Sequence, residues 1–478
     1  MPPLEPSVTG NPIPLQFQPG IQRDNTRLNA NRCIDGEWVR WDGEGKPRKM
    51  RGWRTLTTVQ GIPRGISQFN TSALTYYHIG TPGSLYQFDV DVAGNASSVI
   101  DRSPSGLASS ALNVWHMETM FDAISGDVSL IAQALPIGNA IDGTTQREIY
   151  IGDVTGPGSL TKITDSGTGT LGDITSDGGF FVLFPYLFTL NSGGLAAWSV
   201  ANEPTDFSST GSGEARITGQ KLIAGRQTRG ASGSAPSGLI WSLDRLIRVS
   251  FTGGSTVFAF DEVGATNVLS PACIVEYDGV YFWPGTQRFH TYSGVLRELP
   301  NTQNVDFFFD NINLAARGRC FGFANPRWGE IWWCYPRGSA TECTHAVIFN
   351  VRLGTWYDTP LPNLGRTCAI PPGMGQYPVM GDLRPTGTND AFYRVLQHEF
   401  GVNEVDIGVN NVVRSFFTTP DITLLKGDQP STKRAHALLF EPDFEQTGEL
   451  RMTVLGNANA RAADRTLSTR TIADPSDT

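Results

Sequence analysis

Short runs of β-branched and aromatic residues, separated by Gly, Pro, Asp or Asn, dominate the middle of the chain. Between residues 238 and 300 such runs lie at 239–242, 246–251, 273–277 and 280–283. This pattern is typical of strands, because these side chains pack well on a pleated surface. Asp278 and Gly279 separate the last two runs and favour a type I′ turn. The stretch therefore predicts an antiparallel sheet built from consecutive hairpins.

The strand pattern repeats along the chain. Tryptophans recur in strand-like runs at Trp198, Trp241, Trp283 and Trp332. This spacing of roughly 40–50 residues is typical of propeller blades of about four strands each. The expected units span residues 61–100, 113–163, 179–217, 221–260, 272–299 and 319–356, with 377–396 contributing to closure. We therefore predict an all-β protein, a β-propeller of six or seven blades; the alternative is a large β-sandwich with aromatic strand centres.

Segments of different composition flank this strand-rich region. Residues 1–58 are predicted to form an extended N-terminal arm and first strands, because prolines crowd the first twenty residues. Residues 59–400 are assigned to the propeller, with one short helix expected at 306–316. Residues 401–478 are predicted to form a small C-terminal β section, with strands at 412–417, 437–440 and 449–455. Beyond Gly456 the tail lacks the apolar residues for a core, so a partner would have to order it.

The charge balance narrows the possible functions. With 46 Asp and Glu against 37 Lys and Arg, the formal net charge is −9, which argues against a protein that grips nucleic acid. An acidic surface would still let DNA slide past. The sequence has no run of 18 apolar residues and no N-terminal secretory pattern. We therefore expect a chain of intracellular origin without a membrane anchor.

Residue types that usually carry catalysis form no recognisable pattern here. The sequence has no G-x-S-x-G elbow and no Walker loop, and its G-x-G-x-x-G match at 167–172 lies in a Ser/Thr/Gly linker without a following helix. The six histidines lack metal-pair spacing and the six cysteines match no zinc pattern, so buried thiols are expected. We predict no enzymatic activity, no catalytic residues, no cofactor and no metal.

A cluster of basic residues in the N-terminal section is the candidate for partner contacts. The cluster comprises Lys46, Arg48, Lys49, Arg51 and Arg54. One interpretation is a contact to an acidic neighbour or a phosphate group. The other is a solvated loop face, which nearby acidic residues such as Glu37, Asp42 and Glu44 slightly favour.

The N-terminal section also carries a resemblance to a known family. Residues 17–27, 35–43 and 47–53, together with the phrases at 197–199, 202–207 and 241–244, resemble tail hub, or nozzle, proteins of short-tailed bacteriophages. The resemblance implies a propeller-bearing subunit in a homohexameric ring below the portal and adaptor, around the DNA ejection conduit. The tail beyond Gly456 has no counterpart in it.

What the resemblance implies about partners is specific. It predicts a virion tail protein, assembled in the host cytoplasm, that contacts copies of itself, the head-to-tail adaptor and other tail proteins. Genomic DNA would pass through the channel without sequence-specific binding. Two alternatives stay open: a propeller glycosidase or depolymerase acting on the host surface, which needs two carboxylates roughly 5–10 Å apart, and a carbohydrate-binding propeller.

Overall fold

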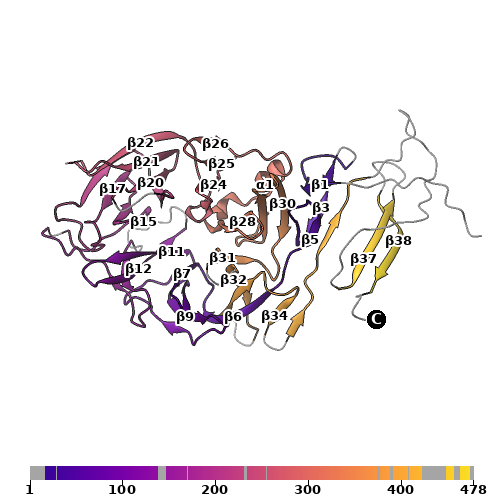
Figure 1. Cartoon of the computed structure of the whole chain (residues 1–478), viewed down its shortest axis with the longest axis horizontal. Coiled ribbons are helices and arrows are strands. Elements are labelled where there is room, and N and C mark those ends of the chain that lie inside the picture. The colour runs from indigo at the N-terminus through magenta and orange to yellow at the C-terminus, as the bar shows by residue number, and fades with distance from the viewer. Residues whose placement is uncertain are drawn as a thin grey trace, which may run out of the picture. The chain divides into compact units, whose positions relative to one another are not determined.

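Seven small sheets arranged in a ring make up most of the molecule, so the predicted β-propeller is confirmed, with seven blades (Figure 1). The chain forms two compact units, residues 19–24 with 33–418, and residues 1–18 with 25–32 and 419–478. The computed structural model describes residues 17–27, 30–137, 147–169, 171–230, 234–254, 256–373, 377–387, 391–406, 409–421, 448–456 and 463–473.

Blades 1 to 3 are four-stranded antiparallel sheets built from consecutive strands. Blade 1 contains β7 (Gly65–Asn70), β8 (Leu74–Gly80), β9 (Leu85–Asp91) and β10 (Ile100–Asp101). Blade 2 contains β11 (Asn113–Asp122), β12 (Asp127–Pro136), β13 (Tyr150–Asp153) and β14 (Thr161–Lys162). Blade 3 contains β15 (Gly179–Leu183), β16 (Tyr186–Leu190), β17 (Leu195–Trp198) and β18 (Gly213–Arg216). Each lies within a unit that the sequence predicted, to within a few residues.

Blades 4 to 6 repeat this arrangement. Blade 4 contains β19 (Leu222–Gln227), β20 (Ser237–Ser242), β21 (Arg245–Phe251) and β22 (Phe258–Ala265). Blade 5 contains β23 (Val275–Tyr277), β24 (Val280–Pro284), β25 (Phe289–Tyr292) and β26 (Leu296–Glu298). Blade 6 contains β27 (Phe321–Asn325), β28 (Glu330–Tyr335), β29 (His345–Asn350) and β30 (Thr355–Pro360). Asp278 and Gly279 both have positive φ, 51° and 80°, as the predicted turn between β23 and β24 requires.

Blade 7 closes the ring by joining distant parts of the chain. Its first three strands are β31 (Arg366–Ile370), β32 (Val379–Pro385) and β33 (Phe392–His398), and its fourth is β6 (Trp53–Gln60), which pairs antiparallel with β33. The expected contribution of 377–396 to closure is therefore confirmed, whereas the part played by 53–60 was not predicted. Two short strands extend this sheet, β34 (Glu404–Asp406) and β35 (Val409–Asn411).

The first strand of each blade lies innermost. Inner strands of neighbouring blades contact one another from β23 through β27, β31, β7, β11 and β15 to β19, and the contact between β31 and β7 joins the last blade to the first. The outer strands then radiate away from the channel in chain order. Because every blade begins at the channel, the inner strands all start at one of its ends and finish at the other.

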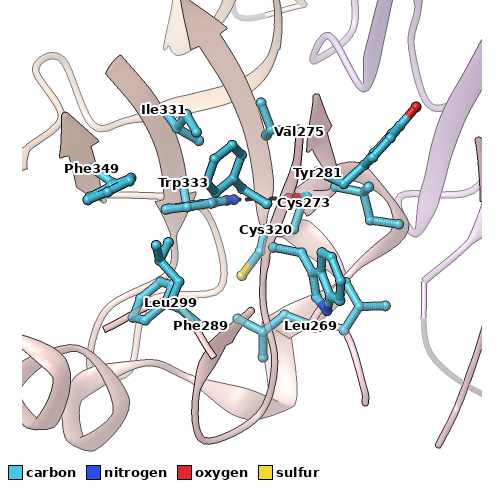
Figure 2. Packing of buried hydrophobic residues seen from close by; sticks show 14 of the residues in the cluster. Leu269, Cys273, Val275, Tyr281, Phe289, Leu299, Cys320, Ile331, Trp333 and Phe349 are labelled. Atoms are coloured by element: carbon cyan, nitrogen blue, oxygen red, sulfur yellow. Dashed lines mark hydrogen bonds between the residues drawn. The ribbon is translucent and has the colours of Figure 1, made fainter. Parts of the chain in front are cut away.

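Aromatic side chains fill the space between blades 5 and 6. Trp333, Phe289 and Trp356 are almost completely buried there, with ring centroids of Phe289 and Trp356 4.6 Å apart. The indole N–H of Trp333 donates a hydrogen bond of 2.9 Å to the carbonyl oxygen of Cys273 (Figure 2). Rings of this size bury large apolar areas, which is the main source of stability for an interface between two sheets.

The interface between blades 1 and 2 is more polar. His78 is fully buried there, with Nδ1 3.2 Å from the Ser67 hydroxyl and Nε2 3.0 Å from the carbonyl oxygen of Val154. The guanidinium of Arg102, also buried, donates to the side chain of Gln87 and to the carbonyl oxygen of Asp153. These hydrogen bonds satisfy the polar groups that the interface takes out of water.

The N-terminal section folds against blades 6 and 7 rather than standing apart. β4 (Val39–Trp41) forms a hairpin with β5 (Pro47–Lys49), and β3 (Asp35–Glu37) pairs with β36 (Phe416–Thr418). A further small sheet joins β1 (Gln18–Ile21) to β2 (Arg32–Cys33). The prolines that predicted an extended arm lie, apart from Pro19, outside the described residues.

The remaining elements are few. The expected helix at 306–316 is present as α1 (Val305–Asn311), followed by the 3₁₀ turn η2 (Leu314–Arg319); a second 3₁₀ turn, η1, spans Pro271–Cys273. All six cysteines are buried free thiols, as predicted. No helix in the described part of the chain is long and apolar enough to cross a membrane.

Candidate functional site

Side-chain contacts bridge the propeller channel at the end where the inner strands begin. Arg64, next to the start of β7, forms two hydrogen bonds of 2.6 and 2.7 Å with the carboxylate of Glu342 in blade 6. Arg319, at the end of η2, lies 3.9 Å from the same carboxylate and donates to the carbonyl oxygen of Ala111, just before β11. Blades 6 and 1 are not neighbours, because blade 7 lies between them. These contacts therefore bridge the channel at this end.

The opposite end of the channel is a cavity. It has a volume of about 620 Å³ and is lined by the later residues of β7, β11, β15, β19 and β31. Propeller enzymes and binding proteins commonly place ligands in such a concave, partly apolar pocket. This cavity is therefore the candidate site for ligand binding or catalysis.

One carboxylate and one guanidinium lie in the cavity wall. Glu118 on β11 accepts hydrogen bonds from the backbone N–H of Val182 (2.7 Å) and from His116 (2.9 Å), and it lies 4.0 Å from Arg226 on β19. Burial raises the pKa of Glu118, but His116, Arg226 and the Val182 N–H outweigh that effect and lower the pKa below its usual value. Glu118 is therefore ionised at neutral pH and cannot act as a general acid.

The described residues of the wall include one carboxylate. Glu118 is the one carboxylate among the described residues that line the cavity, whereas glycoside hydrolysis uses two. Among the residues that the structure describes, no group of three or more His, Cys, Asp or Glu side chains is placed to hold a metal ion. Burial also raises the pKa of Cys33 to about 12 and that of Cys368 to about 11, so these thiols are poor nucleophiles.

The structure divides the predicted basic cluster into two groups. Lys46, Arg48 and Lys49 are exposed on the hairpin of β4 and β5. Arg51 is half-buried, and its carbonyl oxygen accepts a hydrogen bond from the indole of Trp38. Arg54 is held in place, because its guanidinium donates to the side chain of Gln397 (2.7 Å) and to the carbonyl oxygen of Gly94 (3.0 Å). The outward-facing part of the cluster is therefore the hairpin.

Three residues of blade 6, Arg327, Trp328 and Arg352, extend the exposed basic face of the hairpin, and no pattern in the sequence predicted them. The guanidinium of Arg48 lies 5.4 Å from the centroid of the Trp328 ring, and that of Arg327 lies 5.3 Å from it. Arg352 donates to the carbonyl oxygens of Arg327 and Pro326 and so fixes the turn between β27 and β28. Arg48, Arg327 and Arg352 form no ion pair within the described residues. We call Arg48, Lys49, Arg327 and Arg352 the basic surface.

A buried ion cluster holds the hairpin beneath this surface. Arg40 on β4, with no solvent exposure, bonds both oxygens of Glu330 at 2.8 and 2.9 Å and both oxygens of Glu399 at 2.6 and 2.7 Å. Burial lowers the pKa of Arg40, but the two carboxylates outweigh it and raise the pKa above its usual value. Tyr357 and Trp332 donate to Glu330, and Asn325 and Trp328 donate to Glu399. This network gives the hairpin a fixed position on blade 6.

The second compact unit contains an antiparallel hairpin with no core. β37 (Leu450–Gly456) pairs with β38 (Arg465–Ile472), which confirms the strand expected at 449–455. No residue of these two described strands is buried, and Leu467 is 67% exposed. Of the other predicted C-terminal strands, 412–417 is present only in its last two residues, as part of β36, and 437–440 lies outside the described residues.

The fold and the site define a class: a seven-bladed β-propeller whose channel is bridged by side-chain contacts at one end and forms a cavity at the other. No family model and no curated protein matches the chain. Among solved structures it is similar to the crystal structure of the computationally designed Ika8 protein, at 8% identity and a TM-score of 0.37, over 73% of this chain and 99% of that one. A likeness at this level carries no functional argument.

Proposed function

We propose that this chain is a structural subunit of the tail hub, or nozzle, of a short-tailed bacteriophage. In this role copies of the chain join around the DNA ejection conduit as a homohexameric ring, between the adaptor above and other tail proteins. The proposal starts from the resemblance in residues 17–27, 35–43 and 47–53. It also explains why an elaborate propeller lacks a second carboxylate among the described residues of its cavity wall.

The observation that carries the proposal is where the resembling residues lie. Residues 39–43 and 47–53 of the resembling segments form the hairpin of β4 and β5 and the start of β6, which the Arg40 ion cluster fixes to blades 6 and 7. Taking three charged groups out of water is costly, and such clusters are better at fixing a unique arrangement than at adding stability. A fixed platform with its basic side outward suits a subunit that must dock in one orientation.

Charge complementarity supports contact between copies. The chain as a whole carries a formal charge of −9, yet the basic surface has no carboxylate partner among the described residues. In a closed ring each interface is heterologous, so one patch meets a different patch of the next copy. The basic surface of one copy would then face an acidic region of its neighbour, which favours association in a defined register.

The contacts across the channel of each propeller favour a DNA path outside it. η2 and the ion pairs of Glu342 bridge that channel, so we place the conduit between copies, around the axis of the ring. An acidic lining would let the phosphate backbone move without being held. In this proposal each propeller is a structural subunit, and DNA passes through the ring that the copies form.

Charge reversal tests the proposal. In mass photometry and negative-stain imaging of the purified chain with its adjoining adaptor ring, the wild type is expected to form six-fold rings. Arg48→Glu combined with Arg327→Glu is expected to abolish them, because like charges would then meet across the interface. Arg288→Glu is the matched control, since Arg288 is exposed on blade 5 and outside the basic surface. Wild-type chains that stay monomeric with the adaptor present would refute the proposal.

A further inference from the structure

The cavity has the size of a small-molecule site. Its volume of about 620 Å³ lies within the roughly 300–1,000 Å³ of ligand pockets. The Arg64–Glu342 contacts bridge the other end of the channel. The cavity has room for the end of a chain or for one small molecule.

The polar groups of the wall are balanced in charge. Glu118 and Arg226 offset one another at 4.0 Å, so the wall favours neither an anion nor a cation. Two amide groups have unused capacity. Gln68 donates to the carbonyl oxygen of Pro371 and Gln227 accepts from the backbone N–H of Phe184. The side-chain oxygen of Gln68 and the side-chain nitrogen of Gln227 have no partner among the described residues, which leaves the Gln68 oxygen as an acceptor and the Gln227 NH2 group as a donor.

Aromatic rings stand at the open side of the same cavity. Phe121, at the end of β11, and Phe184, in the turn after β15, both line it and are each 40% exposed. The neighbouring Ile124 is 64% exposed. Exposed rings beside free amide groups match a ligand that has an apolar face and a hydroxylated edge.

We propose that this cavity binds the end of a neutral saccharide, one or two sugar rings long. The apolar face of a ring would pack on Phe121 or Phe184. Its hydroxyl groups, which both donate and accept, would bond the free atoms of Gln68 and Gln227 and the charged pair behind them. With Glu118 as its one carboxylate among the described residues, the wall would hold the sugar without cleaving it. This inference does not rest on the proposed tail function, because it concerns a single chain.

A glycan array probed with the fluorescently labelled full-length chain tests the inference, and titration calorimetry of the best glycan quantifies it. We expect neutral glycans to bind, and Phe121→Ala with Phe184→Ala to weaken the affinity at least about tenfold, since both stacking rings are removed. Gln68→Met, which keeps the side-chain volume, probes the same cavity without changing the rim and is expected to weaken binding about fivefold. Leu243→Ala, at an exposed residue that does not line the cavity, should leave the affinity unchanged.

Three results would overturn the inference. The first is an array without neutral glycans above background, and the second is binding confined to acidic glycans. The third is an affinity that neither the phenylalanine pair nor Gln68→Met alters. Because the assay uses the isolated chain, failure of ring assembly would not affect it, and failure to bind glycans would leave the ring proposal standing.

Discussion

The propeller and the C-terminal hairpin are made from the same kind of element and differ in what surrounds it. In the propeller, strands such as β28 are buried along their entire length, and Trp333 is 1% exposed. In the hairpin of β37 and β38, no described residue is buried. An isolated two-stranded hairpin is marginally stable in water. Among the described residues, the hairpin therefore lacks the buried side chains that stabilise the strands of the propeller.

The comparison separates stability from assembly. Changes in the propeller should alter the free energy of unfolding, and changes in the hairpin should alter association while leaving unfolding unaffected. Substitutions in each of the two regions test this separation.

Trp333→Ala is expected to lower the free energy of unfolding by about 4 kcal/mol, because it removes a buried indole and leaves a cavity between blades 5 and 6. Urea unfolding followed by circular dichroism measures this change. The exposed Leu243→Ala serves as control, with a change below about 0.5 kcal/mol. Equal effects at the two positions would contradict the assignment of the core.

Arg40→Met is expected to cost about 3 kcal/mol, because Glu330 and Glu399 would be left buried without their cation. Adding Glu330→Gln and Glu399→Gln should recover part of that loss, since the uncompensated charges disappear. The same unfolding experiment reports both values. If the single variant were as stable as the wild type, the hairpin of β4 and β5 would not be held by this cluster.

Acid should weaken the interface between blades 1 and 2. Burial, followed by the charge of Arg102, lowers the pKa of His78 from 6.5 to about 4. The unfolded chain therefore binds a proton at a higher pH than the folded chain, so the stabilisation is complete above pH 6.5 and is lost as the pH falls toward 4. Between pH 7 and pH 5 the expected contribution is about 2 kcal/mol.

The control for this pH effect is His78→Gln, which cannot take up the proton and should show a stability that varies less between pH 7 and pH 5. Thermal unfolding of both proteins across that range gives the comparison. Parallel pH profiles for the variant and the wild type would show that His78 does not contribute the effect.

Leu467→Asp should have the smallest effect on unfolding, below about 0.5 kcal/mol, because its side chain is 67% exposed. The same substitution should abolish or strongly weaken ring formation, since it places a charge on the hairpin surface that a partner would cover. Leu243→Asp, at 51% exposure on a blade turn, is the matched control and should leave assembly intact. Loss of stability without loss of assembly would reverse the roles assigned to the two regions.

Most of the blades could be predicted because the residues that define each strand and turn lie close together in the sequence. Runs such as 280–283, bounded by turn residues, mark strands without reference to the rest of the chain, and Asp278 with Gly279 specifies its turn through backbone conformation alone. The closing strand β6 was not predicted because its partner β33 lies more than 300 residues away. Nothing near residue 53 indicates that pairing.

The candidate sites were less predictable for the same reason. Five inner strands contribute to the cavity, and neither Glu118 nor Arg226 lies in a motif. The basic cluster was predicted as one stretch, yet Arg54 packs inward, and Arg327 and Arg352 arrive from blade 6. Ring closure brings these residues together from distant parts of the chain. No regular spacing in the sequence therefore indicates that they are neighbours.

Imaging of the wild-type chain with its adaptor ring by cryo-electron microscopy tests the central claim most directly. The account predicts class averages with six propellers around an open axis, the basic surface at each subunit contact and the hairpin covered by a neighbouring protein. Particles that remain single propellers at every protein concentration, with the hairpin free in solvent, would contradict it.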